Sequence, residues 1–206
     1  MPETAFLITA FATLFVVIDP PGLVPLFIAL TRGMGAERRQ AMARRACIIA
    51  AALLLLFGLA GEVILTFIGI SMPAFRIAGG ILLFLTALDM LFERRTQRRE
   101  GQHPDPDHDP SVFPLATPLI AGPGAIATMI LLVGQSGPGW IGTVAVLGLL
   151  LAMIFATYLF FLASPFLERL LGRTGTVVIT RLLGMLLAAL SVQFVIDGVR
   201  GTGLIG

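Results

Sequence analysis

Charged residues are scarce in this chain. Only 13% of its 206 residues are charged, 57% are hydrophobic and the mean hydropathy is +0.96, whereas a soluble domain carries about 25% charged residues. The charges gather in short loops between apolar runs of about 20 residues, the length that crosses a bilayer, and these runs are apolar on all sides. The composition excludes a water-soluble core and predicts an all-α, polytopic protein embedded in a lipid bilayer.

Lysine is absent, and cysteine and histidine are rare. The single cysteine, Cys47, excludes an intrachain disulfide and a cysteine metal cluster. The 14 basic residues are all arginines and lie at the ends of apolar runs, as in membrane proteins, so nucleic acid is not an expected partner. Both histidines, His103 and His108, lie outside the apolar runs, and the sequence contains no His-Glu-x-x-His or Gly-x-Gly-Asp motif. We therefore expect neither an enzyme nor a bound cofactor.

Six apolar runs predict six transmembrane helices, at residues 4–31, 46–68, 74–92, 112–134, 140–165 and 176–199. Eleven of the 14 arginines lie in the segments that follow the first, third and fifth runs. Because arginine-rich loops stay on the cytoplasmic side, these segments are predicted to be cytoplasmic and both termini to lie on the opposite side.

The segment 94–111 divides the chain into two parts, 1–93 and 112–206. It contains His103 and His108 together with Asp105, Asp107 and Asp109, and imidazole and carboxylate groups are metal ligands. The same segment is rich in proline and charge, which is typical of a disordered linker. We favour the linker and assign no metal site.

The two parts resemble one another. A shift of 102 residues places Pro21-Gly22 on Pro123-Gly124, and a shift of 105 residues places Arg76 on Arg181. Each part holds three apolar runs, so the two copies must cross the membrane in opposite directions. Inverted three-helix repeats with a broken helix at matching positions are typical of secondary transporters and indicate the binding site.

Proline and glycine interrupt the first and fourth runs. Because prolines cannot occupy the interior of a continuous helix, the first run is predicted to form half-helices at 4–18 and 22–31, and the fourth to break at 121–125. A break inside hydrocarbon persists only where it lines a cavity or is buried in protein. The freed helix amides suit a carboxylate and Asp19 suits an ammonium group. The predicted substrate site comprises Asp19, Pro20, Pro21, Gly22, Pro25, Gly122, Pro123, Gly124 and Thr128.

Other polar residues within the runs have two interpretations each. Asp19 either binds substrate or a proton, or caps the half-helix that follows it, and both roles are compatible. The charged residues form either fixed ion pairs between the two parts or gating pairs that break during transport: Arg76, Arg181, Asp89, Asp197 and Glu62. The uncharged ones either line the pocket or bond a neighbouring helix: Thr86, Ser191 and Gln193.

Four segments resemble the signature segments of the MarC family of bacterial inner-membrane proteins, which are also described as neutral amino-acid transporters and grouped with the LysE superfamily of exporters. These segments are IDPPGLVPLFIALT, FRIAGGILLFLTALDML, PLATPLIAGPGAIATMIL and VVITRLLGMLLAALSVQFVIDGV. The family pattern Asp-Pro-x-Gly-x-x-Pro is carried by Asp19, Pro20, Gly22 and Pro25, with Pro21 where isoleucine or valine is common.

The resemblance implies export of small neutral amino acids across the inner membrane. The inverted repeats predict alternating access, and active transport would draw on an ion gradient, with a proton or a sodium ion as the candidate coupling ion, or on exchange. It leaves open export of a cation or another small metabolite, and a membrane subunit that transports nothing. The oligomeric state is not indicated.

Overall fold

The computed structural model describes residues 4–92, 109–137 and 139–203, and all regular secondary structure in these ranges is helical. The elements are α1 (Thr4–Ile18), α2 (Pro20–Leu30), α3 (Ala36–Ile68), α4 (Met72–Leu91), η1 (Ser111–Ile120), α6 (Pro123–Gln135), α7 (Trp140–Leu162) and α8 (Ser164–Gly201). Five of the described helical stretches are long and apolar enough to cross a membrane, or six if η1 and α6 count as one bent span. The predicted all-helical membrane architecture is confirmed.

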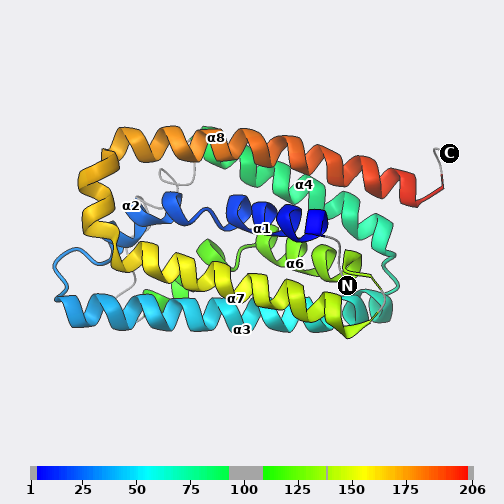
Figure 1. Ribbon diagram of the computed structural model, residues 1–206, viewed down its shortest axis with the longest axis horizontal. Coiled ribbons are helices and arrows are strands. Elements are labelled where there is room, and N and C mark those ends of the chain that lie inside the picture. The colour runs from blue at the N-terminus through cyan, green and yellow to red at the C-terminus, as the bar shows by residue number, and fades with distance from the viewer. Residues whose placement is uncertain (1–3, 93–108, 138, 204–206) are drawn as a thin grey trace.

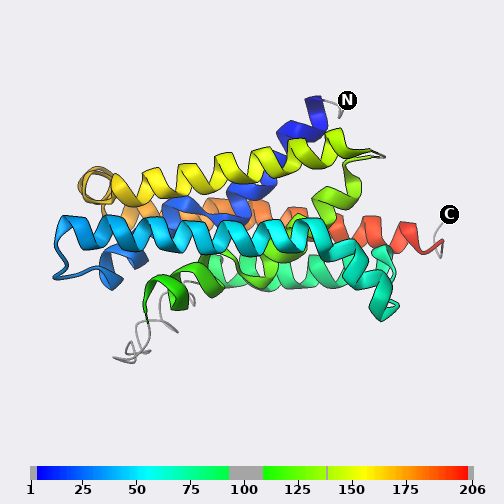
Figure 2. The same ribbon diagram turned by 90° about the horizontal axis from the view of Figure 1, so that it is seen from below.

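Two pairs of long helices enclose the broken ones. Helices α4 and α8 make the most extensive contact in the structure, and α3 packs along α7 on the other side (Figure 1). The segments α1, α2 and α6 lie between these pairs, where α2 contacts α8, α6 contacts α3 and α4, and α1 contacts α7. The segment η1 packs against α3 at the edge of the bundle (Figure 2). Seen from below in Figure 2, α3 and α7 run side by side, and the beginning of α1 extends past α7. The core of the protein is therefore built around the interrupted segments.

Both described chain ends lie at the same end of the helix bundle, and the loop between α2 and α3 and the turn between α7 and α8 lie at the other (Figure 1). This arrangement follows from an even number of crossings. It places the arginines that follow the first and fifth runs together at one end, whereas those at 94–99 lie outside the described residues.

Helix α3 begins ten residues before the predicted start of the second span, at Ala36 instead of residue 46. The extra segment, AERRQAMARR, is amphipathic and therefore does not read as an apolar run. Met42 and Ala43 are buried against the core, whereas Arg38 and Arg44 are exposed. At 1.5 Å per residue the helix is about 50 Å long, against about 30 Å of hydrocarbon. Its first turns therefore extend beyond the apolar part of the bilayer.

The sixth span agrees with the prediction to within two residues, but the helix that contains it begins earlier. Helix α8 follows α7 almost directly, and Gly172 interrupts it with φ 60° and ψ 179°, a conformation open in practice only to glycine. The part long enough to cross the membrane is Thr174–Gly201. The third and fifth spans agree with the prediction to within three residues, at Met72–Leu91 and Trp140–Leu162.

Both predicted helix breaks are present. The first falls at Asp19, which has the left-handed values φ 53° and ψ 61°. The half-helix after it starts at Pro20, two residues before the predicted start, because prolines at the first positions of a helix lose no hydrogen bond. Pro25 lies inside α2 and has no amide hydrogen to donate to the carbonyl of Pro21. The second break separates η1 from α6 with a bend of 53°.

Candidate functional site

At the first break, Asp19 caps the helix that follows it. Its side chain is 2% exposed, and its Oδ1 accepts a hydrogen bond from the amide of Gly22 at 3.1 Å. A carboxylate at this position satisfies a helix amide that would otherwise have no acceptor and suits the positive end of the helix dipole. The capping role predicted as one alternative is therefore formed, and it leaves the substrate role of Asp19 a prediction.

The backbone at this break is packed against α8 without spare room. A Cβ atom added at Gly22 would lie 2.6 Å from Asp19 Cγ and 2.8 Å from Thr180 Oγ1. Pro20 and Pro21 are buried as well. Glycine is thus required here by close approach, and the first break is filled by protein atoms.

The second break lines a cavity of about 220 Å³. Gly122, Pro123 and Gly124 form one wall, and Val17 of α1 contributes to another. Helix α6 begins at Pro123 and has no side-chain cap, so the first-turn amides of Gly124 and Ala125 have no side-chain acceptor. These amides and the positive end of the helix dipole favour an anionic group in the cavity.

Helix α4 adds two polar side chains to the same cavity, Thr86 and Asp89. Thr86 donates its hydroxyl hydrogen to the carbonyl of Leu82 at 2.9 Å, which leaves its oxygen able to accept a further bond. Asp89 is half-buried, and among the described residues its carboxylate has neither a hydrogen bond nor an ion pair. The cavity therefore combines groups that favour an anion with a carboxylate that favours a cation or a proton.

Sequence reasoning assigned Asp89 only to a pair with Arg181, and its place beside the second break was missed. The sequence contains one indication, because Asp89 follows Thr86 by three residues and side chains at this spacing share a helix face. What could not be read from the sequence is that Gly124 packs on this face, where an added Cβ would lie 3.1 Å from Leu83 Cδ2.

The predicted charge pairs are not formed in the part of the chain that the structure describes. Arg76 Nε is buried without a hydrogen-bond partner, and no ion pair joins Arg76 to Asp197 or Glu62, or Arg181 to Asp89. Asp197 instead accepts a hydrogen bond from Gln193 Nε2 at 2.8 Å. Glu62 lines a different pocket, formed with Gly134, Trp140 and Thr143. A gating role for these groups stays a prediction.

The uncharged candidates separate into buried and exposed residues. Thr128 lies one turn after Gly124 on α6, is fully buried, and its hydroxyl has no partner among the described residues. Ser191 is 1% exposed and donates to the carbonyl of Ala188 at 2.6 Å. Gln193 is exposed and lies outside the cavity at the second break. Thr128 is thus the one of the three whose side chain makes no hydrogen bond among the described residues.

An ion pair joins α3 to the end of the segment 94–111, at the arginine-rich end of α3. Arg45 donates to Asp109, whose Oδ1 also accepts hydrogen bonds from the amide and hydroxyl of Ser111 at 2.9 and 2.7 Å. These bonds from Ser111, and to a smaller degree the charge of Arg45, lower the pKa of Asp109 below its ordinary value. His103, Asp105, Asp107 and His108 lie outside the described residues, and the described residues hold no group of three metal-ligating side chains.

The fold and this site define a polytopic α-helical integral membrane protein with two interrupted helices around its core. Residues 4–202 match the model of the MarC family, described as MarC family integral membrane protein. The chain belongs to the MarC family, and the predicted resemblance is confirmed.

Curated relatives agree with this assignment. The chain is 39% identical to the membrane protein YvbG of Bacillus subtilis, over 96% of this chain and 95% of YvbG. It is 36% identical to the inner membrane protein YhgN of Escherichia coli, over 94% of this chain and 96% of YhgN. It is 39% identical to a membrane protein of Archaeoglobus fulgidus, over 94% and 92%. None of these names states an activity, and no solved structure matches the chain.

Proposed function

We propose that this protein is a secondary transporter that exports small neutral amino acids across the bacterial inner membrane, with its termini on the periplasmic side. The observation that carries the proposal is the cavity at the second helix break, which presents uncapped amides of α6 beside the carboxylate of Asp89. A zwitterion needs both kinds of partner, a donor for its carboxylate and an acceptor for its ammonium group.

The size of the cavity supports a small substrate. Its volume of about 220 Å³ lies below the roughly 300–1,000 Å³ that is usual for pockets of drug-sized ligands. Its lining contains no arginine or lysine and one acidic residue, Asp89. An amino acid with a short uncharged side chain therefore fits better than a basic or acidic one.

The helix contacts support two inverted repeats, 1–93 and 112–206, joined by the cytoplasmic linker 94–111. If α1–α2, α3 and α4 correspond to η1–α6, α7 and α8, then the contact of α2 with α8 corresponds to that of α6 with α4. The contacts of α3 with η1 and α6 likewise correspond to those of α7 with α1 and α2. In such repeats, alternating access arises when one bundle rocks against the other around a site near the midplane.

Asp89 and Asp19 are the candidate sites for a coupling proton or sodium ion, because intramembrane carboxylates are costly and functional by default. The free carboxylate of Asp89 also favours the alternative that the exported substrate is a cation. The two possibilities, an amino-acid substrate and a cation substrate, differ in the molecule that crosses the membrane. One transport experiment therefore separates them.

The test is counterflow of labelled alanine into proteoliposomes that contain the full chain. We expect uptake by the wild type and loss of uptake in Asp89→Asn. The melting temperature in detergent should be unchanged, because the carboxylate has no partner to lose among the described residues. Glu168→Gln removes an exposed carboxylate of α8 that lies outside the cavity and has no assigned role, and it should retain transport. Transport of rubidium or another cation, but of no amino acid, would replace the proposed substrate with a cation.

A second pair of variants tests the two breaks. Asp19→Asn keeps a capping oxygen and so should stay folded, and its transport activity reports whether the charge of Asp19 takes part. Gly124→Val places a branched side chain in the cavity and should abolish counterflow. Undiminished transport in Gly124→Val would place the substrate elsewhere.

A further inference from the structure

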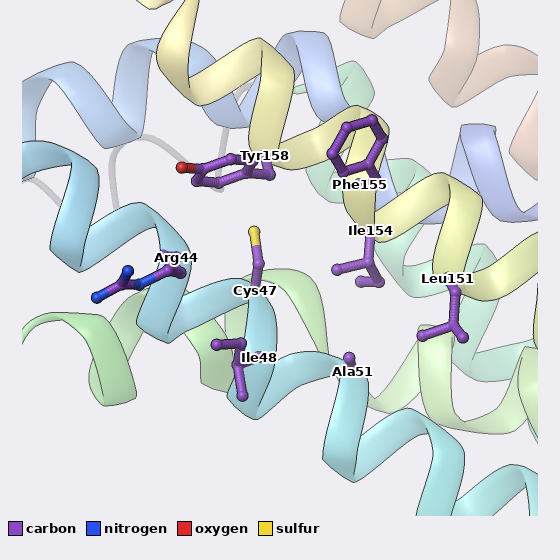
Figure 3. Close-up of a pocket in the computed structure, with 8 residues that line it drawn as sticks. All are labelled: Arg44, Cys47, Ile48, Ala51, Leu151, Ile154, Phe155 and Tyr158. Atoms are coloured by element: carbon purple, nitrogen blue, oxygen red, sulfur yellow. The ribbon is translucent and has the colours of Figure 1, made fainter.

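A second cavity, of about 270 Å³, lies between α3 and α7, away from both helix breaks (Figure 3). Its floor is formed by Cys47 and Ile154, which are 5% and 6% exposed. Beside them, Ile48 and Phe155 are 61% and 60% exposed. This groove therefore opens to the surroundings of the helix pair, which in a membrane are lipids.

The groove is polar at one end only. Figure 3 shows the guanidinium group of Arg44 and the hydroxyl group of Tyr158 at the same end, and Ala51 and Leu151 toward the other. Arg44 and Ala51 are two helical turns apart, so the apolar part extends about 10 Å from the arginine. A charged end followed by a hydrocarbon surface matches the shape of an amphiphilic molecule.

The charge of Arg44 is not paired within the part of the chain that the structure describes. Among the described residues no carboxylate pairs with Arg44, whereas the adjacent Arg45 is bound to Asp109 and Arg39 donates to Ser164 Oγ at 3.0 Å. The orientation predicted from the arginine-rich loops places this end of α3 at the cytoplasmic surface, where anionic lipid headgroups concentrate.

We propose that this groove binds one anionic phospholipid. Its phosphate accepts hydrogen bonds from the Arg44 guanidinium and the Tyr158 hydroxyl, and an acyl chain lies over Ile48, Ala51 and Leu151. Charge-assisted bonds of this kind are the strong ones, and they are less screened at the membrane surface than in water.

A preference of the groove for one phospholipid over another must come from the lipid headgroup. Lipid tails are as apolar as the groove. An acyl chain that moves from the bulk bilayer into the groove therefore packs more closely but gains little free energy. The site should therefore distinguish phosphatidylglycerol, which has net negative charge, from phosphatidylethanolamine, whose ammonium group repels Arg44.

The experiment is a titration of the purified full chain in detergent with each lipid, followed by native mass spectrometry. We expect the wild type to retain one phosphatidylglycerol more tightly than phosphatidylethanolamine. Arg44→Gln should weaken phosphatidylglycerol binding about tenfold, which is the effect of losing one hydrogen bond to a charged group. Arg38→Gln removes an equal charge from an exposed position outside the groove and should change little. Equal losses in the two variants, or equal binding of the two lipids by the wild type, would overturn the proposal.

A second comparison tests the apolar part of the groove. Ala51→Phe fills the groove and should displace the lipid, whereas Ala52→Phe adds the same ring at an exposed neighbouring position outside it and should not. Tyr158→Phe keeps the ring volume and removes only the hydroxyl, so a severalfold loss is expected. Circular dichroism and size-exclusion chromatography confirm that each variant is folded. Unchanged binding of phosphatidylglycerol in both Arg44→Gln and Tyr158→Phe would refute the site. Binding of inorganic phosphate as tight as that of the lipid would refute it as well.

Discussion

Substitution of Gly22 by alanine tests the packing of the first break. The added methyl would lie 2.6 Å from Asp19 Cγ and 2.8 Å from Thr180 Oγ1, closer than carbon atoms approach in folded proteins. Asp19 cannot simply rotate away, because its Oδ1 accepts the hydrogen bond of the Gly22 amide at 3.1 Å. Either α2 separates from α8 or the cap is broken.

The expected loss of folding free energy follows from each of these outcomes. Overpacking a tight site costs about 1–3 kcal/mol, and loss of a helix cap costs about 0.5–2 kcal/mol. We expect a destabilisation of about 2 kcal/mol, which for a chain of this size lowers the melting temperature by about 4–8 °C.

The assay is thermal unfolding of the purified protein in detergent, with Gly148→Ala as the matched control. Gly148 lies in α7, and an added Cβ there meets no atom of the described chain within 4 Å. Removing a glycine from a helix interior stabilises it by about 0.5–1 kcal/mol, so Gly148→Ala should melt at or above the wild-type temperature. Equal melting temperatures for Gly22→Ala and the wild type would show that the first break is not packed as described.

Three further predictions concern other contacts. Asp109 has a lowered pKa in the folded protein. Its contribution to stability is therefore complete above the unfolded pKa of about 3.9 and is lost as the pH falls through the lower folded pKa. Melting curves should show a loss of stability in acid for the wild type that is absent in Asp109→Asn, and identical pH profiles of the two proteins would contradict this prediction. Phe27 is 1% exposed and stacks on Phe161 with ring centroids 4.5 Å apart; Phe27→Ala should cost about 3–5 kcal/mol, and a change in melting temperature of less than 3 °C would be inconsistent with that burial. An added Cβ at Gly61 would lie 2.9 Å from Ile130 Cδ1, so Gly61→Ala should lower the melting temperature. The double variant Gly61→Ala/Ile130→Ala should recover part of that loss. If the two losses of stability were strictly additive in the double variant, the two sites would not be in contact.

The helix breaks could be predicted because they depend on local chemistry. Pro20, Pro21 and Pro123 lack amide hydrogens, and no distant contact can restore them. The beginning of α3 could not be predicted in this way, since the amphipathic segment before residue 46 has no apolar run. Its helix is stabilised by burial of Met42 and Ala43, which is a tertiary effect.

The candidate site was predicted in part. Gly122, Pro123, Gly124 and Thr86 do line one cavity, but Asp19 caps α2, and the acid in that cavity is Asp89. The charge pairs expected for Arg76 and Arg181 depended on assumed depths in the membrane. Side-chain direction around each helix axis decides such contacts, and residue order along the chain does not specify how two helices are rotated against each other.

The sequence by itself determined the membrane class, the approximate limits of most spans and the positions of both breaks, because hydrophobicity and backbone chemistry act within a single segment. Only the tertiary structure decided which polar groups meet. The packing of α6 on α4 places Asp89 in the same cavity as the uncapped amides at the second break, and the packing of α3 on α7 places Arg44 and Tyr158 in the same groove. Each of these two sites combines residues that are far apart in the chain, so no local sequence pattern constrains the geometry between them.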